Sequence, residues 1–195
     1  NRLVQGDVGS GKTVVALIAI FNVVKCGYQA TLMVPTEILA NQHYQEAKKL
    51  LEPFGIHIEL LTGSTSAKEK RRIKELITTD MPMVVIGTHA LIQEDVDFKN
   101  LGLVVTDEQH RFGVEQRNRL INKGRRPDVL VMTATPIPRT LALYVYSDLD
   151  ISVIDKLPPG RKPVKTEFYN GGDRMMAYDL ALDEIRKGRQ VYIVC

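Results

Sequence analysis

The chain has 195 residues, 44% hydrophobic and 25% charged, with a formal net charge of +3 at pH 7, as expected of an ordinary globular protein with a buried core. The weak positive charge permits a polyanionic partner without requiring one. Two distant cysteines, Cys26 and Cys195, argue against a disulfide framework or a zinc site and favour a reducing cytosol. No apolar run reaches the roughly 18 residues of a membrane span, since Asn22 and Lys25 interrupt the best candidate, and we expect neither a membrane segment nor a signal peptide.

The first motif has the sequence GDVGSGKT and matches the pattern G-x-x-x-x-G-K-[ST] at every required position. The apolar residues before it predict the end of a strand, and the apolar run from Val14 to Val24 predicts a helix. Glycines at such a junction let backbone N–H groups and the positive helix end point at one spot. We therefore predict a nucleotide phosphate site, with a chance glycine-rich turn as the alternative. Its residues would be Gly6, Asp7, Val8, Gly9, Ser10, Gly11, Lys12 and Thr13.

Within this site two residues have distinct predicted roles. Lys12 would reach the β- and γ-phosphates of the nucleotide, and the Thr13 hydroxyl would hold Mg²⁺. The predicted ligands of this site are therefore a nucleotide and Mg²⁺.

Strand-like and helical patterns alternate along the rest of the chain. Thr36 is a candidate N-cap for a helix over 37–52, and Ser66 to Glu69 has the pattern of a capping box that opens a second helix. The alternation predicts an α/β fold with a mostly parallel sheet flanked by helices, and ligands bind at the carboxyl ends of such strands. The predicted strands are Ala30–Val34, Ile56–Leu61, Met83–Ile86, Leu101–Val105 and Val129–Met132.

The alternation stops at residues 156–163, where prolines, a glycine and basic residues cannot continue a helix or a central strand. We predict a first domain over 1–155, a linker over 156–163 and the truncated start of a second domain over 164–195. A long surface loop within one domain is the alternative. The second domain would open with a strand, a helix and a strand, at Val164–Tyr169, Asp173–Lys187 and Val191–Val194, so we expect a fragment of a longer protein.

Asp107 and Glu108 directly follow an apolar strand, about a hundred residues after the glycine-rich loop. A carboxylate at such a strand end is the Walker B arrangement, in which it holds Mg²⁺ opposite the threonine of the loop. Asp107 would therefore bind the Mg²⁺ ion through a water molecule, and Glu108 would orient or deprotonate the attacking water. Two solvated acids in a turn are the alternative.

Together with the phosphate loop, Asp107 to His110 (DEQH) resembles the superfamily 2 helicases and translocases. Longer strings resemble the RecG family of bacterial ATP-dependent DNA helicases, and this resemblance covers essentially the whole chain. They are DEQHRFGVEQR (Asp107 to Arg117), MTATPIPRTLA (Met132 to Ala142) and LPPGRKP (Leu157 to Pro163). The related Mfd family shares TATPIPRT, whereas Gln109 and the string PPGRKP favour RecG.

The resemblance implies further site residues. Gln109 and His110 would sense the nucleotide and link the two domains, while Thr133, Ala134 and Thr135 would couple the nucleotide site to bound DNA. Small hydroxyl side chains and backbone N–H groups suit phosphate oxygens, so three segments would contact the DNA backbone without reading its sequence. Taken singly, each is also an ordinary helix N-terminus or turn. Their residues are Pro35, Thr36, Thr62, Gly63, Ser64, Gly87, Thr88 and His89.

The implied function is an ATP-dependent DNA helicase acting on branched DNA, such as replication forks and Holliday junctions, in recombination and repair. The implied fold is a RecA-like domain plus the start of a second one, in the bacterial cytoplasm. Its partners would be DNA and, by family resemblance, a single-stranded-DNA-binding protein. An Mfd-like duplex translocase, a P-loop kinase and a DNA-binding module without a working motor are the alternatives.

The family's adenine-reading motif would precede Asn1, and its arginine that stabilises the transferring phosphoryl group would follow Cys195. The wedge domain that splits forks also lies outside the sequence. Because such an arginine is worth about 10³–10⁵ in rate, we expect the fragment alone to hydrolyse ATP poorly.

Basic residues are concentrated between residues 111 and 126, with Glu115 as the one acid among them. They predict either a DNA-binding or interdomain patch, or a solvated helix face. The residues are Arg111, Arg117, Arg119, Lys123, Arg125 and Arg126.

Overall fold

The computed structural model of the chain describes residues 1–107, 114–135, 149–156 and 164–194, and for residues 114, 115, 117 and 118 the backbone alone. The chain divides into two compact units, Asn1–Pro159 and Gly160–Cys195. The division falls inside the stretch for which the sequence predicts a linker, and residues 157–163 of that stretch lie outside the described part.

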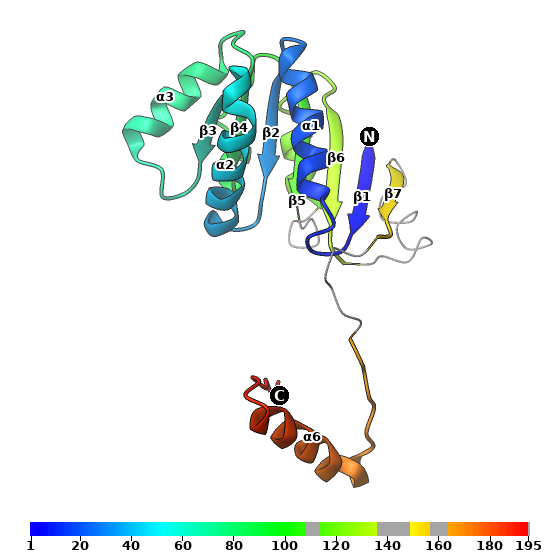
Figure 1. Cartoon of the computed structure of the whole chain (residues 1–195). Coiled ribbons are helices and arrows are strands. Elements are labelled where there is room, and N and C mark those ends of the chain that lie inside the picture. The colour runs from blue at the N-terminus through cyan, green and yellow to red at the C-terminus, as the bar shows by residue number, and fades with distance from the viewer. Residues whose placement is uncertain (108–113, 136–148, 157–163, 195) are drawn as a thin grey trace. The chain divides into compact units, whose positions relative to one another are not determined.

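The first unit is built on a seven-stranded sheet in which every strand pair is parallel (Figure 1). The strand order is β3-β4-β2-β5-β6-β1-β7. The predicted parallel α/β fold is therefore confirmed. The strands are β1 (Arg2–Gly6), β2 (Gln29–Met33), β3 (His57–Leu61), β4 (Met83–Gly87), β5 (Leu101–Asp107), β6 (Asp128–Thr133) and β7 (Asp150–Ile154).

Helices cover both faces of this sheet. Helices α1 (Lys12–Lys25) and α2 (Glu37–Leu51) pack together on one face (Figure 1). Helices α3 (Ala67–Ile77) and α4 (Val114–Ile121) contribute to a second core on the other face. Two short 3₁₀ turns lie in the connections after α2 and β4: η1 (Glu52–Phe54) and η2 (His89–Ile92).

Strand β5 shows why the sequence folds in this way. Leu103 and Val105 belong to the core beneath α1 and α2, whereas Val104 between them belongs to the core beneath α3. A strand buried on both faces needs an unbroken apolar run rather than an alternating one, and such a run is typical of a parallel sheet. The run ends where Thr106 and Asp107 bring the chain to the carboxyl edge of the sheet.

The two predicted N-caps are confirmed. The Thr36 hydroxyl accepts a hydrogen bond from the Leu39 N–H at 3.3 Å, and the Ser66 hydroxyl accepts one from the Glu69 N–H at 3.2 Å. Both bonds satisfy N–H groups that the first turn of a helix leaves without an intrahelical acceptor.

The second unit contains the 3₁₀ turn η4 (Gly171–Asp173) and helix α6 (Arg174–Arg186). The helix was predicted, but the strands predicted at Val164–Tyr169 and Val191–Val194 are wrong, because neither segment is a strand in the structure. An extended segment becomes a strand only when a neighbour accepts and donates its backbone hydrogen bonds. Among the described residues, no such pairing involves either segment.

No described helix is both long and apolar enough to cross a lipid bilayer.

Candidate functional site

The glycine-rich loop joins β1 to α1 at the carboxyl edge of the sheet. Gly9 and Gly11 have φ values of 79° and 97°, a backbone conformation that glycine adopts far more readily than other residues. Gly11 is the N-cap of α1, so the amides of the first helical turn have no intrahelical acceptor. Because these amides lie at the positive end of the helix dipole, the loop is suited to bind an anion.

Lys12 is folded over this loop. Its ammonium donates hydrogen bonds to the Gly6 carbonyl at 2.7 Å and to the Asp7 carbonyl at 2.9 Å. Both acceptors are neutral, so the positive charge remains available to a phosphate. These bonds hold the ammonium against the loop, and its contact with the β- and γ-phosphates stays a prediction.

The Ser10 hydroxyl provides a test of whether the loop fits a phosphate. Its oxygen is buried and has no hydrogen-bond partner among the described residues. A buried hydroxyl without a partner is costly, and a phosphate oxygen would supply the missing partner. The loop therefore fits a bound nucleotide.

Asp107 ends β5, which is separated from β1 by a single strand, β6. Neighbouring strands lie about 4.8 Å apart, so the ends of β5 and β1 are about 10 Å apart across the sheet. Thr13 begins the helix that follows β1 through the glycine-rich loop, so its hydroxyl and the Asp107 carboxylate belong to the same edge of the sheet. Oxygen ligands of this kind suit Mg²⁺, which usually keeps several waters and substrate phosphates as its other ligands.

Thr133 ends the intervening strand β6 and is 3% exposed. Its hydroxyl accepts a hydrogen bond from the Thr135 N–H at 3.1 Å, which shapes the turn at Ala134. The segment predicted to couple ATP and DNA thus lies between the two halves of the nucleotide site.

The predicted DNA-contacting segments follow β2, β3 and β4, which are neighbours in the order β3-β4-β2. Backbone hydrogen bonds join them: the Val34 N–H donates to the Gly87 carbonyl at 2.9 Å, and the Thr88 N–H to the Leu61 carbonyl at 3.3 Å. The Ser64 N–H donates to the Glu37 carboxylate at 3.0 Å. We call these segments, residues 35–36, 62–64 and 87–89, the hydroxyl strip.

Hydrogen bonds from Ser64, through its side chain and its backbone N–H, hold the pKa of the Glu37 carboxyl below its ordinary value. Glu37 is therefore ionised near neutral pH and fixes the loop after β3 to the start of α2.

The side chains of the hydroxyl strip differ in exposure. Thr36, Ser64 and His89 are exposed, whereas Thr62 and Thr88 are 1% and 7% exposed. The Thr62 hydroxyl is within 3.1 Å of the Ser64 hydroxyl and holds the turn together. Thr62 and Thr88 are thus placed to shape the strip, and exposed groups such as Thr36 and Ser64 are placed to touch a ligand.

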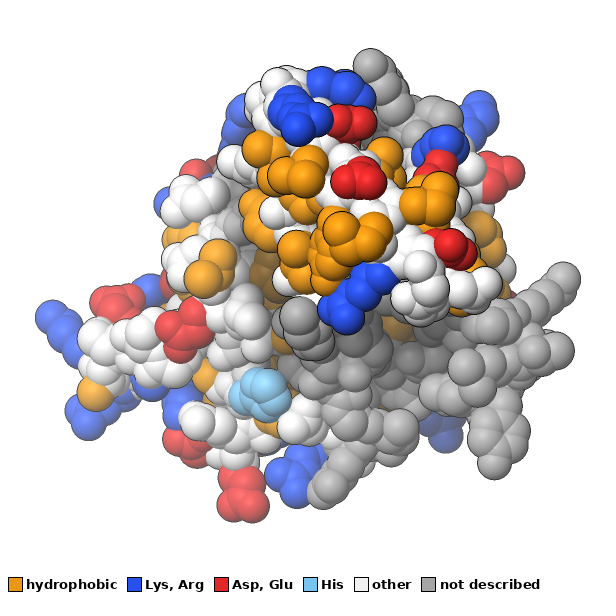
Figure 2. Space-filling view, turned by 90° about the horizontal axis from the view of Figure 1, so that it is seen from below, with side chains coloured by type: hydrophobic (Ala, Val, Ile, Leu, Met, Phe, Trp, Pro, Cys, Tyr) orange, Lys and Arg blue, Asp and Glu red, His pale blue; other side chains and the backbone are white. Residues whose placement is uncertain are grey.

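Figure 2 shows the chain from below, with side chains coloured by type. Its described surface mixes hydrophobic side chains with Lys, Arg, Asp and Glu side chains, rather than showing a single block of positive charge. The residues of the hydroxyl strip include no Lys or Arg, so the contacts with DNA that the sequence predicts would be made by hydroxyl and backbone amide groups.

Several predicted site residues lie outside the described part of the chain: Glu108, Gln109, His110 and, from the basic cluster, Arg111. Their roles stay predictions.

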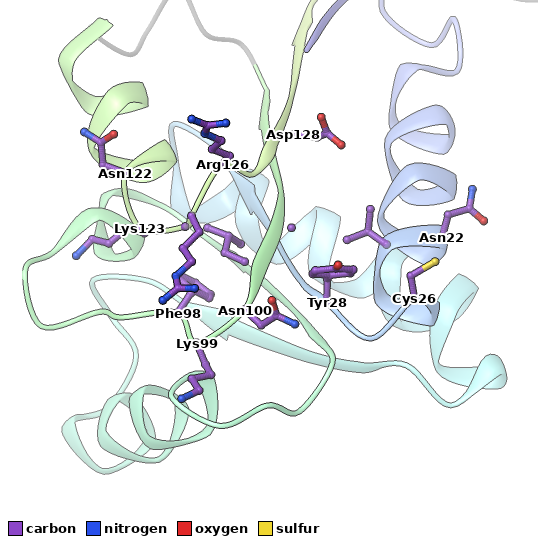
Figure 3. A pocket seen from close by; sticks show the side chains of 15 residues that line it. Asn22, Cys26, Tyr28, Phe98, Lys99, Asn100, Asn122, Lys123, Arg126 and Asp128 are labelled. Carbon is purple, nitrogen blue, oxygen red and sulfur yellow. The ribbon is translucent and has the colours of Figure 1, made fainter.

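Other members of the basic cluster line a cavity of about 760 Å³ at the amino ends of β2, β5 and β6, opposite the glycine-rich loop (Figure 3). Figure 3 shows Lys123 and Arg126 on one wall of this cavity and Asn22 and Cys26 of the α1 region on the other. We call it the amino-edge cavity. This cavity is thus at the edge of the sheet without the nucleotide motif.

Sequence reasoning missed one residue beside the predicted metal ligand. His43 of α2 places its Nε2 atom 3.2 Å from the Asp107 carboxylate. The two residues are 64 positions apart, and no local pattern of the sequence joins them.

Comparison with known proteins gives consistent results. The chain is 55% identical to the ATP-dependent DNA helicase RecG of Synechocystis sp., 53% identical to that of Aquifex aeolicus and 52% identical to that of Bacillus subtilis. The alignments cover 100% of this chain but 23%, 25% and 29% of these relatives. The chain therefore spans about a quarter of their length, and the predicted resemblance to RecG is confirmed.

Solved structures agree with the sequence relatives. A structure of RecG bound to a three-way DNA junction matches with a TM-score of 0.75 and 51% identity, over 96% of this chain and 25% of that chain. The helicase domain of Hef from Pyrococcus furiosus matches with a TM-score of 0.61 and 20% identity, over 80% of this chain and 35% of that chain, and shares the fold.

The DEAD/DEAH box helicase family matches residues 1–143. That match includes the glycine-rich loop, Asp107, the hydroxyl strip and Thr133, all of which the sheet brings to one edge. The chain belongs to the DEAD/DEAH box helicase family.

Proposed function

We propose that this chain is the nucleotide-binding motor domain of an ATP-dependent DNA helicase that acts on branched DNA in recombination and repair. The observation that supports this most is the division of one sheet edge into two adjacent halves. The ends of β1, β6 and β5 form the nucleotide half, and the ends of β2, β4 and β3 form the hydroxyl strip. A motor needs such adjacency because one site must respond to the other.

In the nucleotide half, the loop amides and Lys12 would bind the phosphates of ATP and stabilise charge on the transferring phosphoryl group. Thr13 and Asp107 would hold Mg²⁺, which neutralises charge on the phosphates when bound. Glu108 would orient the attacking water. The division of the chain near residues 156–163 supports a second motor domain beginning at residue 164, and closure of two such domains over ATP would change the grip on DNA.

The proposed substrate follows from the relatives. One matching structure is that of RecG bound to a three-way DNA junction, so a junction or fork is the DNA to test first. By family resemblance we add a single-stranded-DNA-binding protein as a partner to test. Because the relatives named above are bacterial and are named as DNA helicases, we place the protein in the bacterial cytoplasm, where the chromosome lies.

The test uses the full-length protein that contains this chain, with synthetic forks, three-way junctions and linear duplexes. We expect ATP-dependent strand separation on the branched substrates, and none with the Lys12→Ala variant. Movement along duplex without strand separation would support an Mfd-like translocase instead. ATP hydrolysis that no DNA stimulates would contradict the proposal.

A further inference from the structure

His43 occupies an unusual position on helix α2. The buried stripe of this helix consists of Ala40, His43, Ala47 and Leu51, and His43 is the polar member. It is 6% exposed. Burial of an imidazole costs free energy unless its nitrogens are hydrogen-bonded, and an apolar side chain would fill the position without that cost.

One imidazole nitrogen is hydrogen-bonded and the other is not. Nε2 lies 3.2 Å from Oδ2 of Asp107, whose side chain is 14% exposed. An ionised carboxylate can only accept, so Nε2 bears the hydrogen. Nδ1 is buried and has no partner among the described residues. His43 therefore donates a hydrogen bond to Asp107, while its second ring nitrogen is buried without a described partner.

This geometry matters because Asp107 is the predicted magnesium ligand. A hydrogen bond to one oxygen restricts the rotation of the carboxylate about its side-chain bonds. Groups that hydrogen-bond to a metal ligand in this way orient it, and their replacement typically costs about 10–100-fold in metal affinity or activity.

We propose that His43 is a positioning residue that holds the Asp107 carboxylate in the orientation that binds magnesium. This inference rests on the proposed function, which makes Asp107 a magnesium ligand. Helix α2 would then contribute to both halves of the sheet edge, because it begins at Glu37, directly after Thr36 of the hydroxyl strip.

The test compares three variants in the full-length protein. His43→Leu removes the donor and keeps a similar volume, whereas His43→Gln can place an amide N–H near the position of Nε2. His43→Asn places its amide near the position of Nδ1 instead. His57→Leu is the matched control, since His57 also contacts a carboxylate, Glu59 at 2.6 Å, but on β3, away from the glycine-rich loop.

The readout is the binding of the fluorescent nucleotide mant-ADP during a magnesium titration, with a parallel measurement in EDTA. For His43→Leu we expect the half-saturating magnesium concentration to rise about tenfold or more. Binding in EDTA should stay within about twofold of wild type, and His43→Gln should recover most of the magnesium dependence. His57→Leu should match wild type. A merely structural role would change binding in EDTA as well.

An unchanged magnesium midpoint in His43→Leu would overturn the inference. If His43→Leu does not fold, equal midpoints for His43→Asn and His43→Gln would overturn it, and a higher midpoint for His43→Asn would support it. Failure of the proposed function would look different. In that case the wild-type protein would not bind the nucleotide in a magnesium-dependent way, or the Lys12→Ala variant would bind it as wild type does.

Discussion

The two edges of the sheet differ in what they offer a ligand. The carboxyl edge has the glycine-rich loop, Asp107 and the hydroxyl strip, built largely from backbone amides and small polar side chains. The amino edge has the amino-edge cavity, with Lys99, Arg125 and Arg126 on its rim. Among the described residues, no hydrogen bond or ion pair involves these three side chains, so no such contact fixes the positions of their charges.

The difference teaches that volume and charge are poor guides to the chemistry of this fold. A nucleotide site needs amides that are held in place before the ligand arrives, and in the described part of the chain the glycine-rich loop at the carboxyl edge supplies them. Surface cations without fixed geometry attract anions of many kinds and select none.

The largest expected effect comes from Lys12→Ala at the carboxyl edge. The variant removes the ammonium that sits over the loop, so ATP hydrolysis by the full-length protein should fall about 10²–10³-fold or more. DNA binding, measured by fluorescence anisotropy with a labelled fork, should be largely retained. If this variant hydrolysed ATP at the wild-type rate, the carboxyl edge would not be the nucleotide site.

A second change affects stability and touches neither edge. Glu59 of β3 accepts two hydrogen bonds from Arg72 of α3, at 2.7 and 2.8 Å. Burial raises the pKa of the Glu59 carboxyl, but the bonds from Arg72 and His57 outweigh burial and leave the pKa below its ordinary value. Arg72→Leu should therefore lower the free energy of unfolding at pH 7 by about 1–2 kcal/mol.

The sign of the pH dependence follows from the lowered pKa. The stabilisation is present above the unfolded value of about 4.3 and is lost as pH falls through the folded value. Urea unfolding at several pH values should therefore show wild type and Arg72→Leu converging in acid. If the two proteins differed in free energy of unfolding by the same amount at all pH values, the ion pair between Glu59 and Arg72 would not be the source of that difference.

A third comparison tests whether Thr36 contributes to DNA binding or only caps helix α2. Thr36→Ala and Ser66→Ala each remove a capping hydroxyl, so each should cost about 1 kcal/mol of stability. Of the two, only Thr36 belongs to the hydroxyl strip, so only Thr36→Ala should also weaken binding to DNA, by a few-fold. Equal DNA affinities in the two variants would mean that Thr36 caps helix α2 and does not contact DNA.

The smallest effect is expected at the amino edge. Arg125→Glu and Arg126→Glu alter the rim of the amino-edge cavity without contacting the nucleotide half. ATP hydrolysis without DNA should stay within about twofold of wild type, because exposed charges at this distance are screened. A tenfold loss would show that the amino edge takes part in the reaction.

Much of the carboxyl edge could be predicted because its signals are local. The glycines and Lys12 belong to one unbroken motif, and Asp107 comes two residues after an apolar run that is typical of a buried strand. The caps at Thr36 and Ser66 are equally local, since each hydroxyl bonds an amide three residues later.

The remaining features depend on partners that are distant in the sequence. Strand β7 is a short edge strand of mixed polarity, and it is recognisable only through its pairing with β1. The two strands predicted in the second unit show the reverse error, because apolar segments there have no described partner. His43 was missed because the spacing of α2 predicts only that it is buried, and its contact with Asp107 requires the folded sheet.

The most direct test of the account is a structure of the full-length protein with Mg²⁺ and a non-hydrolysable ATP analogue. We expect the phosphates to lie against the amides of Gly9 to Thr13, with Mg²⁺ between the Thr13 hydroxyl and the Asp107 carboxylate. Phosphates bound in the amino-edge cavity, or a metal held by neither Thr13 nor Asp107, would contradict it.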